Sequence, residues 1–288
     1  MVAVFSKQVR GNGLFDTDQW ENFSQIRNGV LTRPREIHYK VIMSMEDIKN
    51  CLHLRYYTYN YVNFIEENQD HLDIDPYDRH STFLGAYDVT AGEKILIGTL
   101  HIISADEQSN ASHHIDELIR TATDLKIRNI CERPELFPIM ESFKVPESYL
   151  SCFGETASQD SAIHPYELSR LAVRPDYWMH NIEVGLHHLL ILDSWLHNPS
   201  RNDFLIAVHP RSRRRYERVG FRVVPGTGEV LYKHINQLAI AMILDLNKYL
   251  QRPQSYRGIC ESLVPFYEEH GYFSRIIERR KSKIKHFI

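Results

Sequence analysis

The spacing of apolar and polar residues divides the chain into short strands and amphipathic helices. Apolar side chains recur at every second position over residues 36–43, which predicts a strand, and a helix that begins at Ser44 is expected to run to about residue 61. Two β-rich runs, 82–88 and 94–103, flank a turn that contains glycine and predict a hairpin. The first part of the chain is therefore expected to fold as strand, helix and hairpin.

The middle of the chain is less regular. Residues 104–160 combine a predicted helix at 115–125 with a stretch that contains several prolines, the usual form of a substrate-side insertion. A strand-like segment, 167–173, then leads into a helix whose apolar residues recur at helical spacing. These residues are Ile182, Leu186, Leu189, Leu192 and Leu196.

The last elements of this pattern are a buried strand at 204–208, a short helix at 213–219 and a closing hairpin formed by 221–224 and 230–234. The complete order is strand, helix, hairpin, insertion, strand, helix, strand, helix and hairpin. Such an order predicts a mixed sheet with helices on both faces, an α/β or α+β fold.

The two ends of the chain lie outside this order. Residues 1–35 have few periodic apolar positions and are expected to form an irregular arm, so that 36–235 is the main domain. Residues 236–288 alternate apolar and charged positions and predict a C-terminal helical extension, which ends in the basic run 279–285. A basic amphipathic tail of this kind is compatible with peripheral contact to an anionic membrane surface.

Composition and charge narrow the possible classes of protein. The 288 residues are 43% hydrophobic and 25% charged, as in soluble globular proteins, and the net charge of −3 argues against nucleic-acid binding through overall charge. Four cysteines without a CxxC pair disfavour disulfides and structural zinc. The sixteen histidines include only adjacent pairs, so no metal site is expected. Neither a signal peptide nor a run of about 20 apolar residues is visible, and a cytoplasmic location is predicted.

Three local signatures, in this order and spacing, resemble the GNAT superfamily and within it the N-acyl amino acid synthases and the related acyl-homoserine-lactone autoinducer synthases. The first is an arginine followed four residues later by an aromatic residue, the second an acidic segment that enters a strand, and the third a Glu-x-Ser-Arg strand. In this chain they correspond to Arg55 with Tyr59, to Asp75 with Asp78, and to Glu167 with Arg170. The resemblance covers about residues 36–235 and implies a GNAT-like acyl-CoA N-acyltransferase fold with a mostly antiparallel sheet.

Two departures from the family pattern affect the expected acyl donor. The family commonly carries Gly-Thr-x-Arg at the end of the hairpin, where this chain has His101. Ordinary acetyl-CoA enzymes hold the CoA pyrophosphate with a glycine-rich loop at a helix start, where this chain has no glycine and has Glu183. An acyl carrier protein, whose pantetheine arm has one phosphodiester, fits such a helix start better than acyl-CoA.

Glu167 is the candidate catalytic base. Amide formation needs a neutral amine, yet an α-amino group with a pKa of about 8 is mostly protonated at neutral pH, and a carboxylate beside the cleft removes that proton. The alternative is a structural partner of Arg170, which lies on the opposite face of a regular strand unless a bulge intervenes.

The resemblance implies further donor-side residues. Backbone amides around Leu171, Ala172 and Val173 are expected to face the thioester carbonyl and pantetheine, with His180 and Asn181 at the start of the next helix. Tyr216 matches the position of the tyrosine that protonates the leaving thiolate in many GNAT enzymes. Its alternative is an aromatic residue that faces the core.

Charged residues supply the remaining candidates. Arg55, Asp75 and Asp78 are expected to form an ion-pair cluster beside Tyr59, or else Arg55 or Arg170 grips the carboxylate of the acceptor. For the two aspartates, solvated surface charge is the alternative. His101 is interpreted as a satisfied strand residue. A basic patch on the short helix is a candidate dock for an acidic carrier protein, or a solvated face. It consists of Arg211, Arg213, Arg214, Arg215 and Arg218.

The leading hypothesis is an N-acyltransferase that joins a long-chain acyl group from acyl carrier protein, or acyl-CoA, to the amine of an amino acid or similar small acceptor, without a cofactor. Autoinducer synthesis from S-adenosylmethionine ranks lower, because the tryptophan that family usually carries after the first helix is absent from residues 60–72. A catalytically inactive sensor or binding module of the same fold is the alternative from a different class.

Overall fold

A computed structural model describes residues 34–104, 109, 111–145, 164–178, 180–197, 201–233, 235–246, 249 and 257–277. Its strands are β1 (Arg35–Ile42), β2 (Ser81–Asp88), β3 (Ile95–Ser104), β4 (His164–Val173), β5 (Arg201–Val208), β6 (Arg222–Val223), β7 (Glu229–Tyr232), β8 (Gln237–Asp245) and β9 (Phe273–Ile277). Its α-helices are α2 (Met45–Tyr61), α3 (Ser112–Thr121), α4 (Leu125–Arg128), α6 (Ile182–His197), α7 (Arg213–Val219) and α9 (Arg257–His270). Short 3-10 turns include η1 (Asp78–His80) and η2 (Pro138–Glu141).

The strands form a single nine-stranded sheet in the order β6-β8-β5-β4-β3-β2-β1-β9, with β7 also paired to β8. Among the pairs in the described chain, β4 and β5 run parallel and the others antiparallel. The element order expected from the sequence is confirmed as far as β5 and α7. This is the mixed, mostly antiparallel sheet that the resemblance implied.

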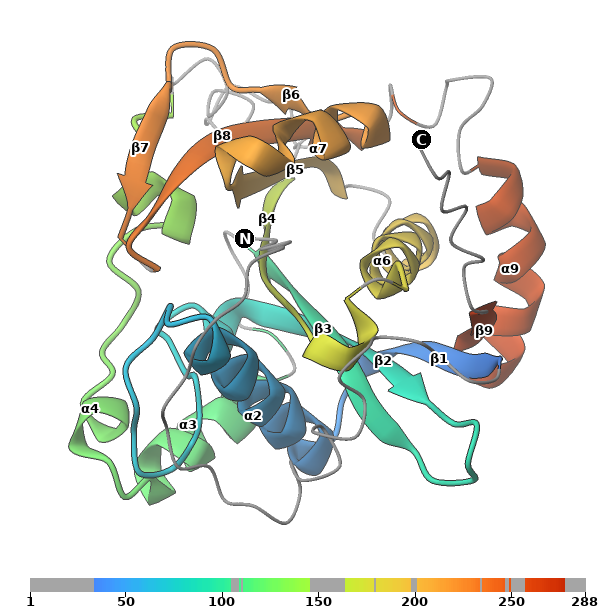
Figure 1. Ribbon diagram of the computed structural model, residues 1–288, viewed down its shortest axis with the longest axis horizontal. Helices are drawn as coiled ribbons and strands as arrows, with labels where there is room; N and C mark the ends of the chain where they lie inside the picture. Colours follow the sequence, from blue (N-terminus) through green and yellow to red (C-terminus); the bar gives the residue numbers. More distant parts are fainter. Residues whose placement is uncertain are drawn as a thin grey trace, which may run out of the picture.

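Helices cover both faces of the sheet (Figure 1). Alternate residues of β2 show this, because Leu84 packs in the cluster that contains the apolar face of α6, whereas its neighbour Phe83 packs in the cluster that contains α2 and α3. On the α6 face, the ring of Tyr39 from β1 occupies the space where a side chain at Gly185 would lie. Helix α9 packs against α6 on the same side (Figure 1).

The expected helical extension at residues 236–288 is wrong for two segments. β8 lies inside the sheet between β5 and the short strands β6 and β7, and β9 pairs with β1 at the far edge. Six consecutive residues of β8 are buried, because both of its faces are covered. A continuous apolar run of this kind does not show the alternation of a strand, and periodicity alone does not distinguish it from a buried helix. Among the described residues of this region, α9 confirms the expected helical character.

Two smaller expectations also need correction. The predicted hairpin of 221–224 with 230–234 is replaced by β6 and β7 that each pair with β8, with no pairing between them in the described chain. The helix predicted at 115–125 is divided into α3 and α4, with Ala122 in an extended conformation between them. The N-terminal arm at 1–33, the segment 146–163 and the basic run at 279–285 lie outside the described residues.

Candidate active site

A β-bulge in β4 determines which side chains face the site. Thr99 pairs with Ala172 and His101 pairs with Ser169, so that two residues of β4, Arg170 and Leu171, lie opposite a single residue of β3. Arg170 has φ of 55°, a conformation in which non-glycine residues are uncommon. The extra residue resets the alternation of the strand. The sequence alone did not decide whether β4 has a bulge, and the structure has one.

The bulge brings Glu167 and Arg170 to the same face of the sheet. Arg170 reaches Asp75 on the α2 side, and Glu167 accepts a hydrogen bond from the backbone of η2 on that side. Leu168 and Leu171 instead pack in the cluster on the α6 face. In a strand without a bulge, residues three apart point to opposite faces.

Beyond Glu167, β4 and β5 diverge. Their parallel pairing ends where Glu167 lies opposite Leu205, although both strands continue. The diverging halves enclose a small pocket, lined by Ser169 and Leu171 from β4 and Ile206 from β5 and closed by His187 of α6 and Tyr216 of α7. Strands that separate in this way leave backbone amide and carbonyl groups unpaired along the gap, available to an extended ligand.

Tyr216 is both a buried aromatic residue and a lining residue of this pocket. Its side chain belongs to the core cluster and is 4% exposed, as the alternative reading expected. Its hydroxyl, however, makes no hydrogen bond to any group in the described part of the chain, and burial raises its pKa. The hydroxyl therefore stays protonated at neutral pH and is a potential proton donor to a group in the pocket.

His187 shares the pocket with Tyr216, with ring centroids 6.1 Å apart in an edge-to-face arrangement. Its Nδ1 lies 2.6 Å from the carbonyl oxygen of Glu183, so Nδ1 carries the hydrogen and Nε2 is a hydrogen-bond acceptor. Burial lowers the pKa of His187 to about 4 and keeps the ring neutral. No role for His187 is predicted from the sequence, because an adjacent histidine pair has no recognisable functional spacing.

Glu167 is enclosed and its pKa is shifted far upward. The side chain is 1% exposed, and Oε2 accepts a hydrogen bond from the Ile139 backbone N–H at 2.9 Å. Burial raises the pKa of Glu167 to about 8, with Asp75 adding to the effect and Ile139 and Arg170 opposing it. This value lies close to the pKa of about 8 for a free α-amino group, so a proton passes between the two at little cost in free energy.

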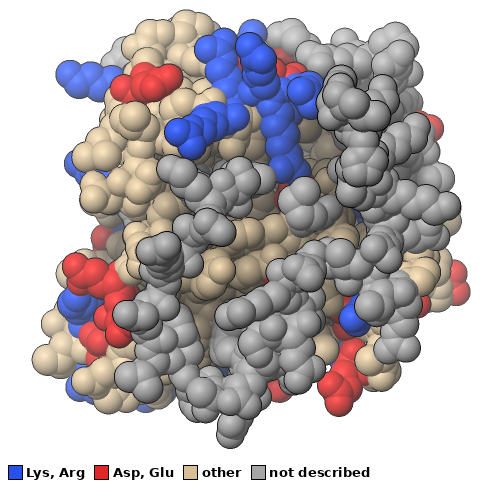
Figure 2. All heavy atoms as spheres, viewed as in Figure 1, with Lys and Arg blue, Asp and Glu red and all other residues tan. Residues whose placement is uncertain are grey.

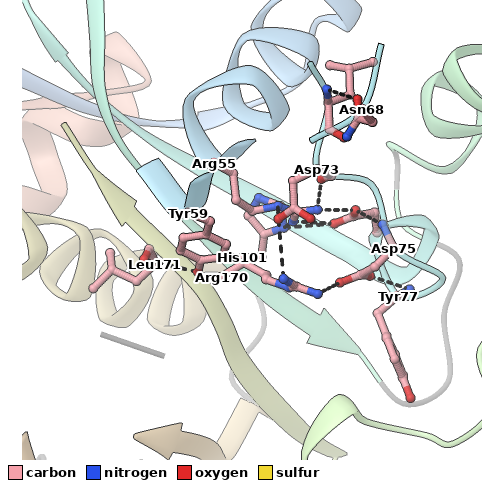
Figure 3. A network of polar contacts seen from close by, with 11 residues as sticks. Arg55, Tyr59, Asn68, Asp73, Asp75, Tyr77, His101, Arg170 and Leu171 are labelled. Atoms are coloured by element: carbon pink, nitrogen blue, oxygen red, sulfur yellow. Dashed lines mark hydrogen bonds and ion pairs between the residues drawn. The ribbon is translucent and has the colours of Figure 1, made fainter. Parts of the chain in front are cut away.

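Beside Glu167, a buried ion-pair cluster joins α2, β4 and the acidic segment 72–78 (Figure 3). Arg55 donates to both carboxylate oxygens of Asp78, at 2.9 and 2.7 Å, and its Nε lies 2.6 Å from Asp73. Arg170 donates to Asp75 at 2.6 Å and lies 3.4 Å from Asp73. Asp73, which was not among the predicted site residues, therefore bridges the two arginines.

The predicted charges are thus brought together rather than exposed. Asp75 and Asp78 are 7% and 1% exposed, so solvated surface charge does not describe them. Burial alone would raise the pKa of Asp78, but Arg55 and His101 outweigh it and hold that pKa well below its usual range. Both guanidinium groups are already engaged by carboxylates, which leaves neither free to grip the carboxylate of an acceptor without breaking a buried ion pair.

Tyr59 connects this cluster to the pocket, whereas His101 lies within the cluster. The ring of Tyr59 lies 5.9 Å from the Arg170 guanidinium, and its hydroxyl donates to the Leu171 carbonyl at 3.4 Å. His101 is fully buried, with Nδ1 3.1 Å from Asp78 and 3.0 Å from Arg55. Burial, followed by the charge of Arg55, lowers the pKa of His101, so the ring that stands where the family commonly has arginine is neutral.

The predicted donor-side residues are only partly gathered. Leu171 lines the pocket, whereas Ala172 and Val173 are buried in the clusters on opposite faces of the sheet. His180 and Asn181 precede the first turn of α6, and Asn181 has φ of 53°. In that first turn Glu183 forms an ion pair with Arg215 of α7.

The basic patch, formed by α7 and the turn at 210–212 just before it, is largely exposed. Figure 2 shows Lys and Arg side chains gathered at the top of the view, over the region where Figure 1 places α7. Arg211, Arg214 and Arg218 are exposed and have no carboxylate partner in the described part of the chain. Arg213 pairs with Glu217 at 2.6 Å on the same helix, and Arg215 is occupied by Glu183. The patch therefore presents three uncompensated positive charges.

The described ranges hold neither a cluster of metal ligands nor a membrane-spanning helix. They contain no group of three or more His, Cys, Asp and Glu side chains placed to hold a metal ion. None of the described helices is long and apolar enough to cross a bilayer.

No protein-family model matches the chain, and neither does any curated protein. Among solved structures, the chain is similar to FeeM, an N-acyl amino acid synthase from uncultured soil microbes, at 14% identity over 75% of this chain and 92% of that chain with a TM-score of 0.45. It is similar to BjaI, a CoA-dependent acyl-homoserine lactone synthase, at 14% identity over 80% of this chain and 90% of that chain with a TM-score of 0.46. It is also similar to the AHL synthase LasI, at 14% identity over 73% of this chain and 89% of that chain with a TM-score of 0.41. These likenesses concern the fold and assign no role to any residue of this chain.

Proposed function

We propose that the protein is an N-acyltransferase that moves a long-chain acyl group from acyl carrier protein, or from acyl-CoA, to the amine of an amino acid or similar small acceptor. One observation carries the proposal. Glu167, with a pKa of about 8, is the last residue of β4 that pairs with β5, and the pocket that contains Tyr216 begins where the strands diverge. In this proposal Glu167 is the base, Tyr216 is the acid, and the thioester occupies the gap between the two strands.

The reaction balances with these two groups. The amine nitrogen attacks the thioester carbonyl, and the ionised form of Glu167 takes the proton that the nitrogen must lose. When the carbon–sulfur bond breaks, the hydroxyl of Tyr216 gives a proton to the departing thiolate. The products are the amide and the free thiol, and a proton passes from Glu167 back to Tyr216 through solvent between turnovers. Unpaired amides of β4 along the gap stabilise the oxyanion of the intermediate.

The exposed arginines support a carrier protein as the donor. Arg214 and Arg218 of α7, with Arg211 in the turn just before it, form a positive surface without a carboxylate partner among the described residues, and α7 also supplies Tyr216 to the pocket. Acyl carrier proteins are acidic, and complementary charge speeds docking. A pantetheine arm that enters beside α7 would reach the gap between β4 and β5.

The test is a turnover assay with purified protein, palmitoyl-acyl carrier protein or palmitoyl-CoA, and a mixture of the common amino acids, read by mass spectrometry for acyl amides. Acyl amides are expected from the wild type and from Glu117→Gln, a control at an exposed glutamate of α3, and not from Glu167→Gln. Absence of product with either donor would overturn the proposal. A parallel reaction with S-adenosylmethionine that yields acyl-homoserine lactone would identify the autoinducer alternative, and donor binding without product would identify a sensor.

A further inference from the structure

Two side-chain contacts join α6 and α7 beside the gap in the sheet. In the first contact, the ring centroids of His187 and Tyr216 lie 6.1 Å apart, and the two rings close the pocket. The second contact lies one helical turn earlier on α6, where Glu183 forms an ion pair with Arg215 of α7. The two side chains of this pair are 9% and 37% exposed, so the carboxylate is buried and the guanidinium lies at the surface.

The Glu183–Arg215 ion pair lies at the N-terminus of α6, a helix of sixteen residues. The first turn of a helix has backbone N–H groups without helical partners and a positive partial charge, and such positions bind phosphates. In this chain the first turn itself carries a carboxylate, that of Glu183, and its counterion Arg215 comes from α7. An incoming diphosphate therefore meets a neutral ion pair rather than a free binding site, and must displace Glu183 to reach Arg215.

We propose that Glu183 and Arg215 select the acyl donor, an inference that rests on the proposed acyltransferase function. The Glu183 carboxylate takes the place of a diphosphate at the start of α6. A donor with a single phosphodiester, such as phosphopantetheine attached to a carrier protein, passes the pair without breaking it. A donor with a nucleotide diphosphate, such as CoA, is selected against.

The two members of the pair have opposite expected effects on CoA binding, which separates this idea from simple repulsion by negative charge. Removing the charge of Glu183 frees Arg215 to bind phosphate. Removing Arg215 leaves a buried carboxylate without its counterion, and this carboxylate then repels any anion. A chain in which the pair only holds α6 against α7 would lose CoA affinity equally with either substitution, or not at all.

The experiment measures CoA affinity by calorimetry, without any turnover. Glu183→Gln is expected to bind CoA about tenfold more tightly than the wild type, the size of one charge–dipole and ion-pair contribution, and Arg215→Gln more weakly. The matched control is Glu217→Gln, which removes the exposed Arg213–Glu217 pair of α7 and should leave CoA affinity unchanged. Pantetheine, which has no phosphate, should bind the wild type and Glu183→Gln equally.

A double variant guards against misfolding. Exchanging the charges, with Glu183→Arg combined with Arg215→Glu, restores an ion pair and should return CoA affinity toward that of the wild type. Equal CoA affinity of the wild type and Glu183→Gln, or an equal gain for pantetheine, would overturn the selectivity proposal and leave the acyltransferase proposal intact. Absence of acyl amides in the turnover assay, together with the expected CoA affinities, would instead overturn the proposed function alone.

Discussion

The buried carboxyl group of Glu167 offers a test that needs no substrate. Replacing it by glutamine keeps the shape of the side chain and an oxygen that accepts the Ile139 N–H hydrogen bond, seen at 2.9 Å, but removes the ability to ionise. Burial raises the pKa of Glu167 from an ordinary value of 4.5 to about 8. Folding therefore holds a proton on this group that the unfolded chain releases.

The sign of the pH effect follows from this difference. Between pH 4.5 and pH 8 the folded chain binds more protons at Glu167 than the unfolded chain, so the free energy of unfolding decreases as the pH rises. The stabilising contribution is fully present below pH 4.5. From pH 5 to pH 8 the expected loss is about 3 kcal/mol, because each pKa unit corresponds to about 1.4 kcal/mol.

The assay is urea unfolding of the wild type, Glu167→Gln and the exposed control Glu117→Gln at several values between pH 5 and pH 8. Other titrating groups contribute equally to the wild type and the variants, so the comparison isolates Glu167. Glu167→Gln is expected to gain about 3 kcal/mol of stability relative to the wild type across this range, while Glu117→Gln gains none. A difference between Glu167→Gln and the wild type that stays constant with pH would refute the burial argument and the assignment of the base.

Three further substitutions test other parts of the structure. Tyr216→Phe removes a hydroxyl without a partner in the described chain, so it should lower kcat about 10- to 100-fold in the acyl amide assay with little change in melting temperature. Asp78→Asn leaves the fully buried Arg55 short of one counterion and should cost about 3 kcal/mol or more in urea unfolding, against less than about 1 kcal/mol expected for Asp116→Asn, which breaks an exposed pair. Gly185→Ala places a methyl group into the ring of Tyr39 and should lower the melting temperature, although alanine is the better helix former, and Tyr39→Leu should relieve part of the loss. A stable Gly185→Ala variant, a neutral Asp78→Asn variant or a fully active Tyr216→Phe variant would contradict the corresponding assignment.

The sequence predicted the elements whose side chains follow one clear period. The helix α6 has a regular apolar repeat, and Ser44 caps α2 by accepting a hydrogen bond from the Asp47 N–H. The pairing of Arg55 with Asp78 was also expected, because the charged residues of the two signatures are of opposite sign and fall in segments that the resemblance places together.

The remaining features depend on contacts that no local pattern encodes. The positive φ of Arg170 is held by Asp73 and Asp75, which lie far away in the sequence, so the bulge that turns Arg170 toward Glu167 has no local signal. The pKa of Glu167 depends on burial by η2, from within the segment expected to be irregular. The apolar run of β8 predicts part of a helix rather than a strand, because neighbours that bury both faces of β8 remove the alternation of a strand.

The pairing of β9 with β1 has a consequence for how the chain reaches its fold. Arg35 of β1 pairs with Ile277 of β9. The ribosome therefore synthesises β9, the partner of the outer edge of β1, long after it has released β1 and β2. Until then, β1 presents a free strand edge, and free edges are templates for association with other chains. We therefore expect a chain that ends before β9 to aggregate during synthesis. Such a chain would still contain every residue of the pocket and of the ion-pair cluster.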